Sequence, residues 1–318
     1  MRKALITGIA GFAGSHLTEC LGGRAQIWGT HIDGNLENLS SAKGVHLIKC
    51  DLLNFEQTSA AVKSAAPDVI FHLAAQSAPS LSIAKPAETL KNNIFSTLNV
   101  FEAASAFAPQ AIIINAGSAD AYGEVGQRDL PVKESARFDP VNPYAVSKAT
   151  TDMMALQYFK SRGLRVIRCR PFNHIGPRQA PNFASPTFAK QIAEIEAGIK
   201  KDNVMHVGSL EAQRDFLDVR DVASAYDILS EKGVPGEAYN ICSGKAIKIQ
   251  EILDTLIGLS KVKIAVARDP SKMRRGDVKL IYGDNSKLKA LGWSQKHDIK
   301  ECLRTLLDYW RMKVSIKS

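Results

Sequence analysis

The sequence has few cysteines, no long apolar run and no internal repeat. Its five cysteines are scattered over 318 residues without a C-x-x-C pair, which argues against a disulfide framework or a zinc site and predicts reduced thiols in a cytoplasm. No run of 18 apolar residues occurs, and no charged-then-apolar leader precedes the first expected strand. We therefore expect an unexported protein with no membrane partner and no bound metal.

Acidic residues are outnumbered by basic ones only in the second half. Residues 1–159 carry 12 Lys and Arg against 14 Asp and Glu, whereas residues 160–318 carry 29 against 18. This surplus comes with no recognised nucleic-acid-binding motif and no basic run interleaved with aromatics, so no nucleic-acid partner is expected. A polyanionic small molecule such as a diphosphate is the favoured partner, and simple solubility is the alternative explanation for much of the charge.

Glycine is present where a dinucleotide site needs it. Residues 4–7 are apolar and predict a strand, Gly8, Gly11 and Gly14 follow, and residues 15–21 have a helical pattern. A strand, a glycine-rich turn and a helix in this order predict a pyrophosphate site at the positive end of the helix. A glycine-rich turn that merely ends a strand is the alternative.

Apolar strands alternate with helical patterns through the first half. The predicted strands are residues 4–7, 25–30, 45–48, 69–73, 111–115 and 165–169, with a long helix at 87–106. This alternation predicts an α/β fold with a Rossmann-type, doubly wound parallel sheet. The ligand cleft should lie at the carboxyl ends of these strands, where the chain has Gly8, Ala74 and Ser118.

The pattern weakens after residue 171. The elements predicted there are a loop at 172–185, a charged turn at 211–220, a basic loop at 268–279, strands at 203–207 and 237–242, and helices at 186–197, 222–229, 249–259 and 299–310. We expect a Rossmann domain over residues 1–170, to which 216–240 returns. A smaller, discontinuous C-terminal α/β substrate domain is expected over 171–215 and 241–318.

Tyr144 and Lys148 would share one face of a helix, one turn apart. An ammonium this close to a phenol is expected to lower the pKa of the tyrosine towards working pH, which suits a proton donor or acceptor at a carbonyl or carbinol. The pair alone is a weak signal, because most chance occurrences are solvated helix faces. Ser118 strengthens it as a hydroxyl for the same oxygen, with a turn cap beside Gly117 as its alternative role.

Several motifs occur in an order that identifies a family. They are Thr7-Gly-x-x-Gly-x-x-Gly14, Asp51-Leu52, His72-Leu-Ala-Ala75, Asn93, Ser118 ahead of Tyr122-Gly123, and Tyr144-x-x-x-Lys148. Together they resemble the extended short-chain dehydrogenase/reductase family (NAD-dependent epimerase/dehydratase) that acts on nucleotide sugars. The stretches similar to its GDP-mannose branch are 170–177, 188–192, 207–221, 239–244 and 269–275.

The resemblance implies reduction of the C4 ketone of a GDP-linked keto-deoxy sugar, GDP-4-keto-6-deoxy-D-mannose, with NADPH or NADH. Tyr144 would deliver a proton to the ketone oxygen, Ser118 would hydrogen-bond that oxygen, and Lys148 would tune Tyr144 and hold the nicotinamide ribose. A GDP-mannose 4,6-dehydratase, a nucleotide-sugar 4-epimerase and a non-catalytic dinucleotide-binding sensor are the alternatives. A homodimer is also implied, since dimers built on helix pairs are common in the family.

The resemblance assigns residues to each ligand. Those expected at the cofactor are Gly8, Gly11, Phe12, Gly14, Asp51, Leu52, Leu73, Ala74, Ala75, Asn93, Tyr144, Lys148 and Pro171. Those expected at the GDP sugar are Ser118, Asp120, Asn173, Lys190, Arg214, Arg274 and Asp277. The choice between NAD and NADP stays open, because the second strand is followed by Thr30, His31 and Asp33 and by no arginine for a 2′-phosphate.

Asp120 departs from the dehydratases of this family, which carry a glutamate there as the base for the sugar C5 proton. A side chain one methylene shorter falls short by about 1.3–1.5 Å, and a misplacement of about 1 Å can lose roughly 100-fold in rate. The two consecutive arginines that the GDP-mannose dehydratase carries after its second strand are also missing. Both departures favour the reductase. His72 and His174 are expected to be structural.

Overall fold

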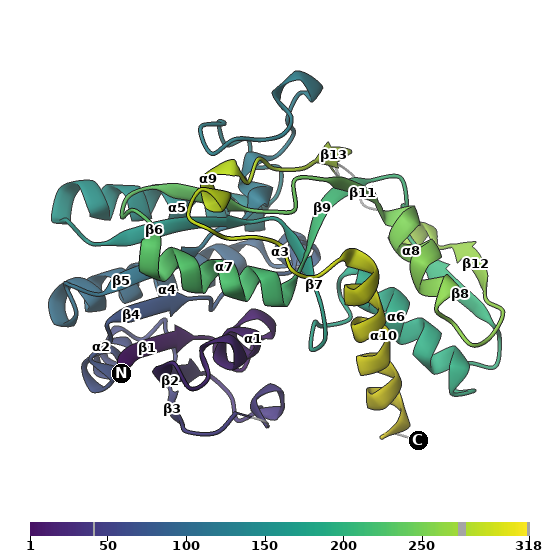
Figure 1. Cartoon of the computed structure of the whole chain (residues 1–318), viewed down its shortest axis with the longest axis horizontal. Coiled ribbons are helices and arrows are strands. Elements are labelled where there is room, and N and C mark those ends of the chain that lie inside the picture. The colour runs from purple at the N-terminus through teal and green to yellow at the C-terminus, as the bar shows by residue number, and fades with distance from the viewer. Residues whose placement is uncertain (41, 273–277, 317–318) are drawn as a thin grey trace.

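The computed structural model describes residues 1–40, 42–272 and 278–316, and a seven-stranded sheet is its largest feature (Figure 1). The strand order is β10-β6-β5-β4-β1-β2-β3, and every neighbouring pair is parallel. The strands are β1 (Arg2–Thr7), β2 (Ala25–His31), β3 (Val45–Lys49), β4 (Val69–His72), β5 (Ile112–Ala116), β6 (Val166–Pro171) and β10 (Ala238–Ile241). This is the doubly wound sheet that the sequence predicts.

Helices bury both faces of the sheet. On one face lie α1 (Phe12–Leu21) and α7 (Val219–Lys232); on the other lie α2 (Phe55–Ala65), α4 (Pro86–Phe107) and α5 (Pro143–Arg162). The central strands are Val- and Ile-rich and alternate between two cores, so that Ile6 packs with Leu17 of α1 while Leu5 packs with Phe101 of α4. Continuous apolar strands of this kind are typical of parallel sheets covered on both sides.

Two late segments return to this sheet. Helix α7 packs against α1, and β10 pairs with β6, although the chain between β6 and α7 belongs to other layers (Figure 1). The strand predicted at 237–242 is therefore a sheet strand. The division of the chain into two domains at the expected boundaries stays a prediction.

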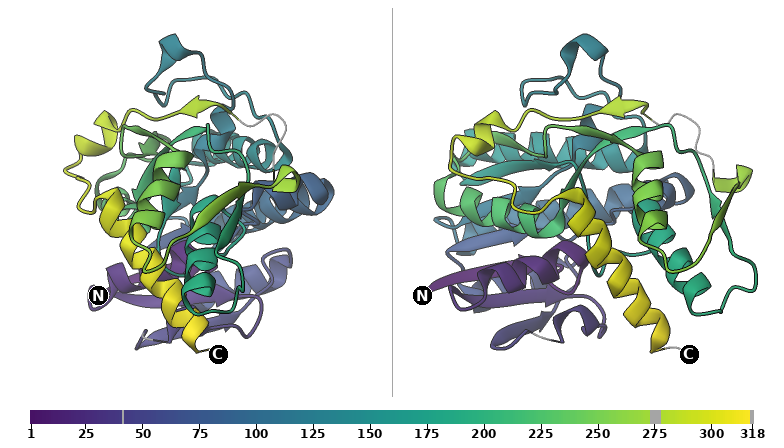
Figure 2. Two further views of the ribbon diagram at one scale, coloured as in Figure 1. Left: turned by 90° about the vertical axis from the view of Figure 1, so that its right-hand side faces the viewer. Right: turned by 45° about the vertical axis from the view of Figure 1, so that its right-hand side comes forward.

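The remaining chain forms a second group of elements beside the carboxyl ends of the strands (Figure 2). Its strands are β7 (Asn173–Ile175), β8 (Val204–Val207), β9 (Gln213–Asp218), β11 (Ala246–Lys248), β12 (Ala265–Arg268) and β13 (Leu280–Ile281). Its helices are α6 (Ala184–Glu196), α8 (Ile249–Gly258) and α10 (Ile299–Ser315), which share one apolar core with β7, β8 and β9. Strand β9 pairs with β7, β11 and β13, and β8 pairs with β12.

Short elements complete the part of the fold that the structure describes. They are α3 (Pro79–Ala84), α9 (Ser286–Lys289) and four 3₁₀ turns, η1 (Glu37–Leu39), η2 (Ala119–Tyr122), η3 (Gln127–Asp129) and η4 (Pro270–Lys272). All five cysteines lie in the described part of the chain and are free thiols. None of the helices in that part is long and apolar enough to cross a membrane.

The predicted charged turn at 211–220 is wrong, because most of it is the buried strand β9. Asp215 is fully buried, and its carboxylate accepts hydrogen bonds from the amides of Ser243, Gly244 and Gly283 and from the Ser243 hydroxyl. Asp218 caps α7 by accepting from the Arg220 amide. Satisfied carboxylates can thus lie inside a sheet. The predicted loop at 172–185 likewise contains β7.

Candidate active site

The glycine-rich turn after β1 packs too closely for side chains. Gly8 has φ +68°, and its amide donates to the Thr30 carbonyl oxygen at 3.1 Å. A Cβ on Gly14 would lie 2.4 Å from the Gly8 carbonyl oxygen and 2.8 Å from that of Ile9. Helix α1 begins directly after this turn, at Phe12, so its first backbone amides are free to bind an anion. This backbone therefore fits the pyrophosphate of a dinucleotide.

Thr7, the last residue of β1 before the glycine-rich turn, is hydrogen-bonded to the residues that follow β4. The Thr7 hydroxyl oxygen accepts from the Leu73 and Ala74 amides at 3.1 and 3.2 Å and also contacts His72 Nδ1 at 2.9 Å. A Cβ on Gly8 would lie 3.0 Å from the Ala74 Cα, so these two segments leave no room for larger residues. The sequence prediction missed Thr7, although it opens the glycine motif.

His72 has a structural role at this point. Its Nε2 contacts the Thr97 hydroxyl at 3.0 Å, opposite Thr7, and complete burial lowers the pKa of the imidazole to about 3. The ring is therefore neutral at physiological pH and joins β1 to α4. This matches the structural role expected for it.

The other predicted cofactor residues lie at the same edge of the sheet. Asp51 and Leu52 follow β3, and the Asp51 carboxylate accepts from the Leu53 amide at 3.0 Å. Pro171 is the last residue of β6 and is buried. Contact of these residues with a cofactor stays a prediction.

Asn93 connects the end of β4 to the helix that carries Tyr144. From α4, its amide oxygen accepts from the Gln76 amide at 2.8 Å. Its nitrogen donates to the Gln76 carbonyl oxygen at 3.0 Å and to the Ser147 hydroxyl at 2.9 Å. The structure thus gives Asn93 a positioning role that the sequence did not show, and its direct contact with a cofactor stays a prediction.

The structure brings Ser118, Tyr144 and Lys148 together. Tyr144 and Lys148 lie in the first turns of α5, with 8% and 7% of their surface exposed. Ser118 precedes η2 and accepts from the Asp120 amide at 3.1 Å, and its hydroxyl lies close enough to Tyr144 to lower the pKa of the phenol. Ser118 therefore caps a turn, as its alternative role required, and also contacts the phenol.

The expected effect of Lys148 on Tyr144 is wrong. Burial raises the pKa of Tyr144 above that of a free phenol, the Asp120 carboxylate raises it further, and the nearby Ser118 hydroxyl lowers it only in part. The Lys148 ammonium donates to the Ala116 carbonyl oxygen at 2.7 Å and lies 6.0 Å from the centre of the Tyr144 ring. Tyr144 is therefore a protonated phenol at neutral pH, as a proton donor to a ketone must be.

Two comparisons identify the family. The model described as GDP-mannose 4,6 dehydratase matches residues 5–306. A GDP-6-deoxy-D-mannose reductase from Pseudomonas aeruginosa is 34% identical over 314 residues, which is 98% of each protein. The chain belongs to the GDP-mannose 4,6-dehydratase family, a branch of the extended short-chain dehydrogenases/reductases. A GDP-mannose 4,6-dehydratase from Yersinia enterocolitica is 26% identical over 95% of this chain and 91% of that protein.

Solved structures support the same family. The structure of RMD from Pseudomonas aeruginosa complexed with NADPH has a TM-score of 0.86 and 34% identity, and the match covers 98% of this chain and 100% of that one. A UDP-glucose 4-epimerase from Thermus thermophilus in complex with NAD has a TM-score of 0.87 and 28% identity over 97% and 98% of the two chains. The predicted Rossmann-type fold and family resemblance are confirmed.

The titration of Lys148 predicts that the activity of this protein depends on pH. Complete burial lowers the pKa of its ammonium to about 8, so the charge is present below that pH and is lost above it. Because kcat/KM reports groups of the free enzyme, we expect kcat/KM for a sugar substrate to fall about tenfold per pH unit above pH 8. Initial rates at low substrate concentration, between about pH 6 and pH 10, measure this limb. Lys148→Met should have a low, flat profile there; a wild-type profile that stays flat over the whole range would contradict the assignment.

Three of the predicted substrate residues, Asn173, Lys190 and Arg214, come from the second group of elements. Asn173 is the first residue of β7 and pairs with Phe216 of β9. Its strand therefore lies beside β9, the strand that carries Arg214. Arg214 Nη1 donates to the Gln213 carbonyl oxygen at 2.9 Å. Lys190 of α6 is 40% exposed, pairs with Glu194 at 3.5 Å and lies 5.9 Å from the Trp310 ring centre. Arg274 and Asp277 lie outside the described residues.

A buried polar network holds η2, and with it Ser118, against α5. Arg170 donates to both carboxylate oxygens of Asp152 on α5, at 2.8 and 3.0 Å, and to the Tyr122 hydroxyl of η2 at 2.9 Å. Tyr122 in turn donates to the Asn240 side chain of β10 at 2.7 Å. Arg170 and Tyr122 stand in motifs quoted for the resemblance, yet only the fold shows that they meet.

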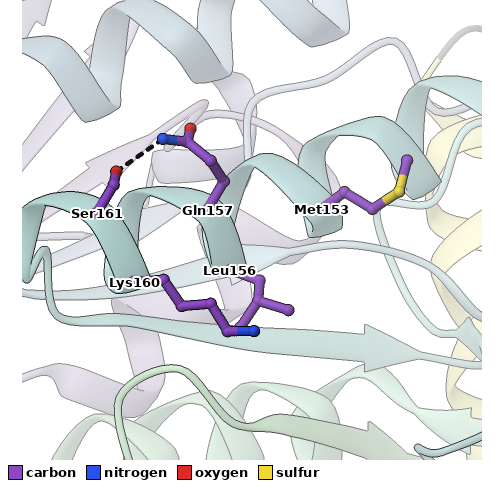
Figure 3. A pocket seen from close by; sticks show the side chains of 5 residues that line it. All are labelled: Met153, Leu156, Gln157, Lys160 and Ser161. Atoms are coloured by element: carbon purple, nitrogen blue, oxygen red, sulfur yellow. Dashed lines mark hydrogen bonds between the residues drawn. The ribbon is translucent and has the colours of Figure 1, made fainter.

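Helix α5 also has a surface hollow that is separate from this site. Its lining residues are Met153, Leu156, Gln157, Lys160 and Ser161, which follow the catalytic turns along the helix (Figure 3). Gln157 donates to the Ser161 hydroxyl at 2.7 Å. The hollow is lined by none of Ser118, Tyr144 and Lys148, so it is distinct from the site described above.

Proposed function

We propose that this protein is an NADPH- or NADH-dependent reductase that converts the C4 ketone of GDP-4-keto-6-deoxy-D-mannose into the alcohol, giving GDP-D-rhamnose. The observation that carries the proposal is the buried, protonated Tyr144 phenol at the carboxyl edge of the sheet, with the Ser118 hydroxyl close enough to lower its pKa. The full-length similarity to a GDP-6-deoxy-D-mannose reductase supports the choice of substrate.

Each catalytic side chain has a separate task in this proposal. Tyr144 gives its proton to the C4 oxygen as negative charge grows there, and the Ser118 hydroxyl hydrogen-bonds the same oxygen. Lys148, whose ammonium donates to the Ala116 carbonyl oxygen, holds the nicotinamide ribose. The nicotinamide, when bound, supplies the hydride.

The rest of the site divides between two ligands. For the cofactor, Gly8, Gly11, Phe12 and Gly14 offer backbone to the pyrophosphate, while the ends of the other strands offer Asp51, Leu52, Leu73, Ala74, Ala75 and Pro171. For the GDP sugar, the second group of elements offers Asn173, Lys190 and Arg214, with Arg274 and Asp277 outside the described residues. Arginine suits a diphosphate because its planar fork makes paired charge-assisted hydrogen bonds.

The two ligands correspond to two proposed domains. Residues 1–170 together with 216–240 form the NAD(P)-binding domain, and 171–215 together with 241–318 form the nucleotide-sugar domain. We also infer a cytoplasmic homodimer built on α4 and α5, whose outer faces carry Phe95 and Met153 with 53% and 58% of their surface exposed. Large exposed apolar side chains of this kind are typical of interfaces.

The proposed function is tested by following absorbance at 340 nm. GDP-4-keto-6-deoxy-D-mannose should cause oxidation of added NADPH or NADH, and mass spectrometry should show a product two hydrogen atoms heavier than the keto sugar. A preparation that binds the dinucleotide but leaves the keto sugar unchanged would overturn the proposal.

GDP-mannose 4,6-dehydratase is the second candidate. The Asp120 carboxylate raises the pKa of Tyr144, and Asp120 occupies the sequence position at which dehydratases carry their base. The reductase has no general-base step, so we expect Asp120→Ala to keep keto-sugar reduction within about 10-fold of wild type. Wild-type protein given only GDP-mannose should form no 4-keto-6-deoxy product detectable by mass. Formation of that product, and its loss in Asp120→Ala, would instead make the protein a dehydratase.

A further inference from the structure

Arg178 has a backbone conformation that favours glycine. It lies in the segment after β7 with φ +73°, in the left-handed region, where a side chain costs conformational energy. Strain of this size persists only where the surrounding contacts compensate for it. The side chain of Arg178 must therefore make contacts that a glycine would lose.

Those contacts all reach the cofactor side of the molecule. The Arg178 guanidinium donates to both carboxylate oxygens of Glu19, at 2.7 and 2.8 Å, and contacts His16 Nδ1 at 2.8 Å. It also donates to the Asn38 carbonyl oxygen at 3.1 Å. Glu19 and His16 belong to α1, Asn38 belongs to η1 after β2, and the guanidinium side chain is only 13% exposed.

These partners border the glycine-rich turn. The Asn38 side chain donates to the carbonyl oxygen of Ala10 in that turn at 2.9 Å. His16 Nε2 contacts the Pro177 carbonyl oxygen at 3.0 Å, so the backbone beside Arg178 is also held against α1. The Phe12 ring, at the start of α1, stacks on His174 with 5.6 Å between ring centres. Strand β7 thus contacts the start of α1 at the turn proposed to bind the pyrophosphate, and the segment after β7 contacts α1 and η1 beside it.

A second contact holds η1 from the same side. Lys313 of α10 forms an ion pair with Glu37, the residue before Asn38. Helix α10 packs on α6 and α8 in the second group of elements, and its C-terminal end reaches η1. The connection between β2 and β3, where a dinucleotide-binding fold places the adenosine ribose, is therefore held in place by late parts of the chain.

We propose that Arg178 is a positioning residue for the cofactor: it holds η1 and, through Asn38, the glycine-rich turn in the arrangement that binds the adenosine end of NAD(P)H. The second strand is followed by no arginine in the sequence, and the fold brings one there from the second half. This inference rests on the proposed cofactor. Arg178 acts through other residues, so it is not catalytic.

The size of the effect follows from the contacts. A forked, largely buried arginine–carboxylate pair is among the stronger polar interactions, and its loss typically weakens an equilibrium by about 10- to 100-fold. The Glu19 side chain is 46% exposed, so water can replace part of the interaction that its carboxylate loses with Arg178. We therefore expect Arg178→Ala to weaken NADPH or NADH binding by about 10-fold.

The experiment measures the dissociation constants of NADPH and NADH by fluorescence titration of the whole protein, without any sugar, in four variants. Arg178→Ala and Arg178→Gly should lose affinity for the cofactor equally, because both lack the guanidinium. Arg178→Gly should unfold at a higher temperature than Arg178→Ala, because glycine adopts the left-handed backbone conformation without strain. Arg178→Lys should recover part of the affinity.

Arg311→Ala, the fourth variant, is the matched control, since Arg311 makes a comparable forked pair with Glu196 between α10 and α6, and its hydrogen-bond partners Glu196, Asp308 and Leu259 all lie in the second group of elements. It should lose thermal stability and keep wild-type affinity. In steady-state assays Arg178→Ala should raise KM for the cofactor about 10-fold with kcat within about 3-fold.

Affinity of Arg178→Ala within about 2-fold of wild type, or an equal loss in Arg311→Ala, would overturn the inference. A wild-type protein that binds NADPH but reduces no keto sugar would overturn only the proposed function. A wild-type protein that binds neither dinucleotide would overturn both.

Discussion

Tyr144→Phe is expected to lower kcat for keto-sugar reduction by about 10²- to 10⁴-fold, the usual contribution of a positioned general acid. The phenol is buried close to the Ser118 hydroxyl and protonated at neutral pH, and phenylalanine removes only its hydroxyl group. The dissociation constant of NAD(P)H should change by less than about 3-fold, because the ring and the helix remain. Stopped assays at saturating substrate and fluorescence titration of the cofactor give the two numbers.

Tyr158 offers a matched control on the same helix. It is also buried, but its hydroxyl donates to Glu102 on α4 and lies outside the catalytic group. Tyr158→Phe should keep wild-type kcat. If Tyr144→Phe retains activity within a few-fold, another group donates the proton and the assignment of Tyr144 fails.

Gly14→Ala is expected to abolish measurable NAD(P)H binding, with a loss of at least about 100-fold. The added Cβ would lie 2.4 Å from the Gly8 carbonyl oxygen and 2.9 Å from the Ile9 Cα, and backbone atoms cannot rotate away as a flexible side chain would. The glycine-rich turn must therefore shift, which moves the amides that the pyrophosphate needs. Isothermal titration with NADPH, together with circular dichroism to show that the fold persists, measures the effect.

Gly258 provides the comparison for Gly14. It ends α8 in the second group of elements, and a Cβ built there meets no atom within 4 Å. Gly258→Ala should bind NADPH as the wild type does. Retention of wild-type affinity in Gly14→Ala would show that the turn adapts and that its packing does not determine cofactor binding.

The first half of the fold was predictable because its signals are local. The glycine spacing between β1 and α1, the apolar strands and the Tyr144–Lys148 pair each lie within a few residues of one another, and each element appears within a few residues of its expected bounds. The return of β10 to the sheet was also expected. The register of β10 against β6 could not be predicted from the sequence, because no residue near Ala238 specifies which residue of β6 it pairs with.

Strand β9 was mispredicted because its stabilising partners are distant. Three of its six residues are Arg214, Asp215 and Asp218, which is the composition of a solvated turn. The groups that satisfy Asp215 come from Ser243, Gly244 and Gly283, well beyond any local window. Charge in a sequence thus predicts exposure only when no later segment supplies hydrogen bonds.

Two features of the site were invisible for the same reason. The sequence predicted that Lys148 lies one turn from Tyr144. It did not predict the burial that raises the pKa of the phenol, because that burial depends on how α5 packs. Arg178 gave no local signal at all, because its partners on α1 and η1 precede it by 140 residues or more. In both cases the missing information was the environment of the residue: the packing around Tyr144, and the distant partners of Arg178.

The position of β10 also has a consequence for biosynthesis. When Pro171 leaves the ribosome, six strands of the large sheet are available, but β6 still has an unpaired edge. Its partner follows about 70 residues later, which at roughly 5–20 residues per second takes about 3–14 s. During that interval the nascent chain presents an open strand edge to other chains, a template for misassembly. Slow translation or truncation between β6 and β10 should therefore promote aggregation, whereas a chain released after Ile241 can pair β10 with β6.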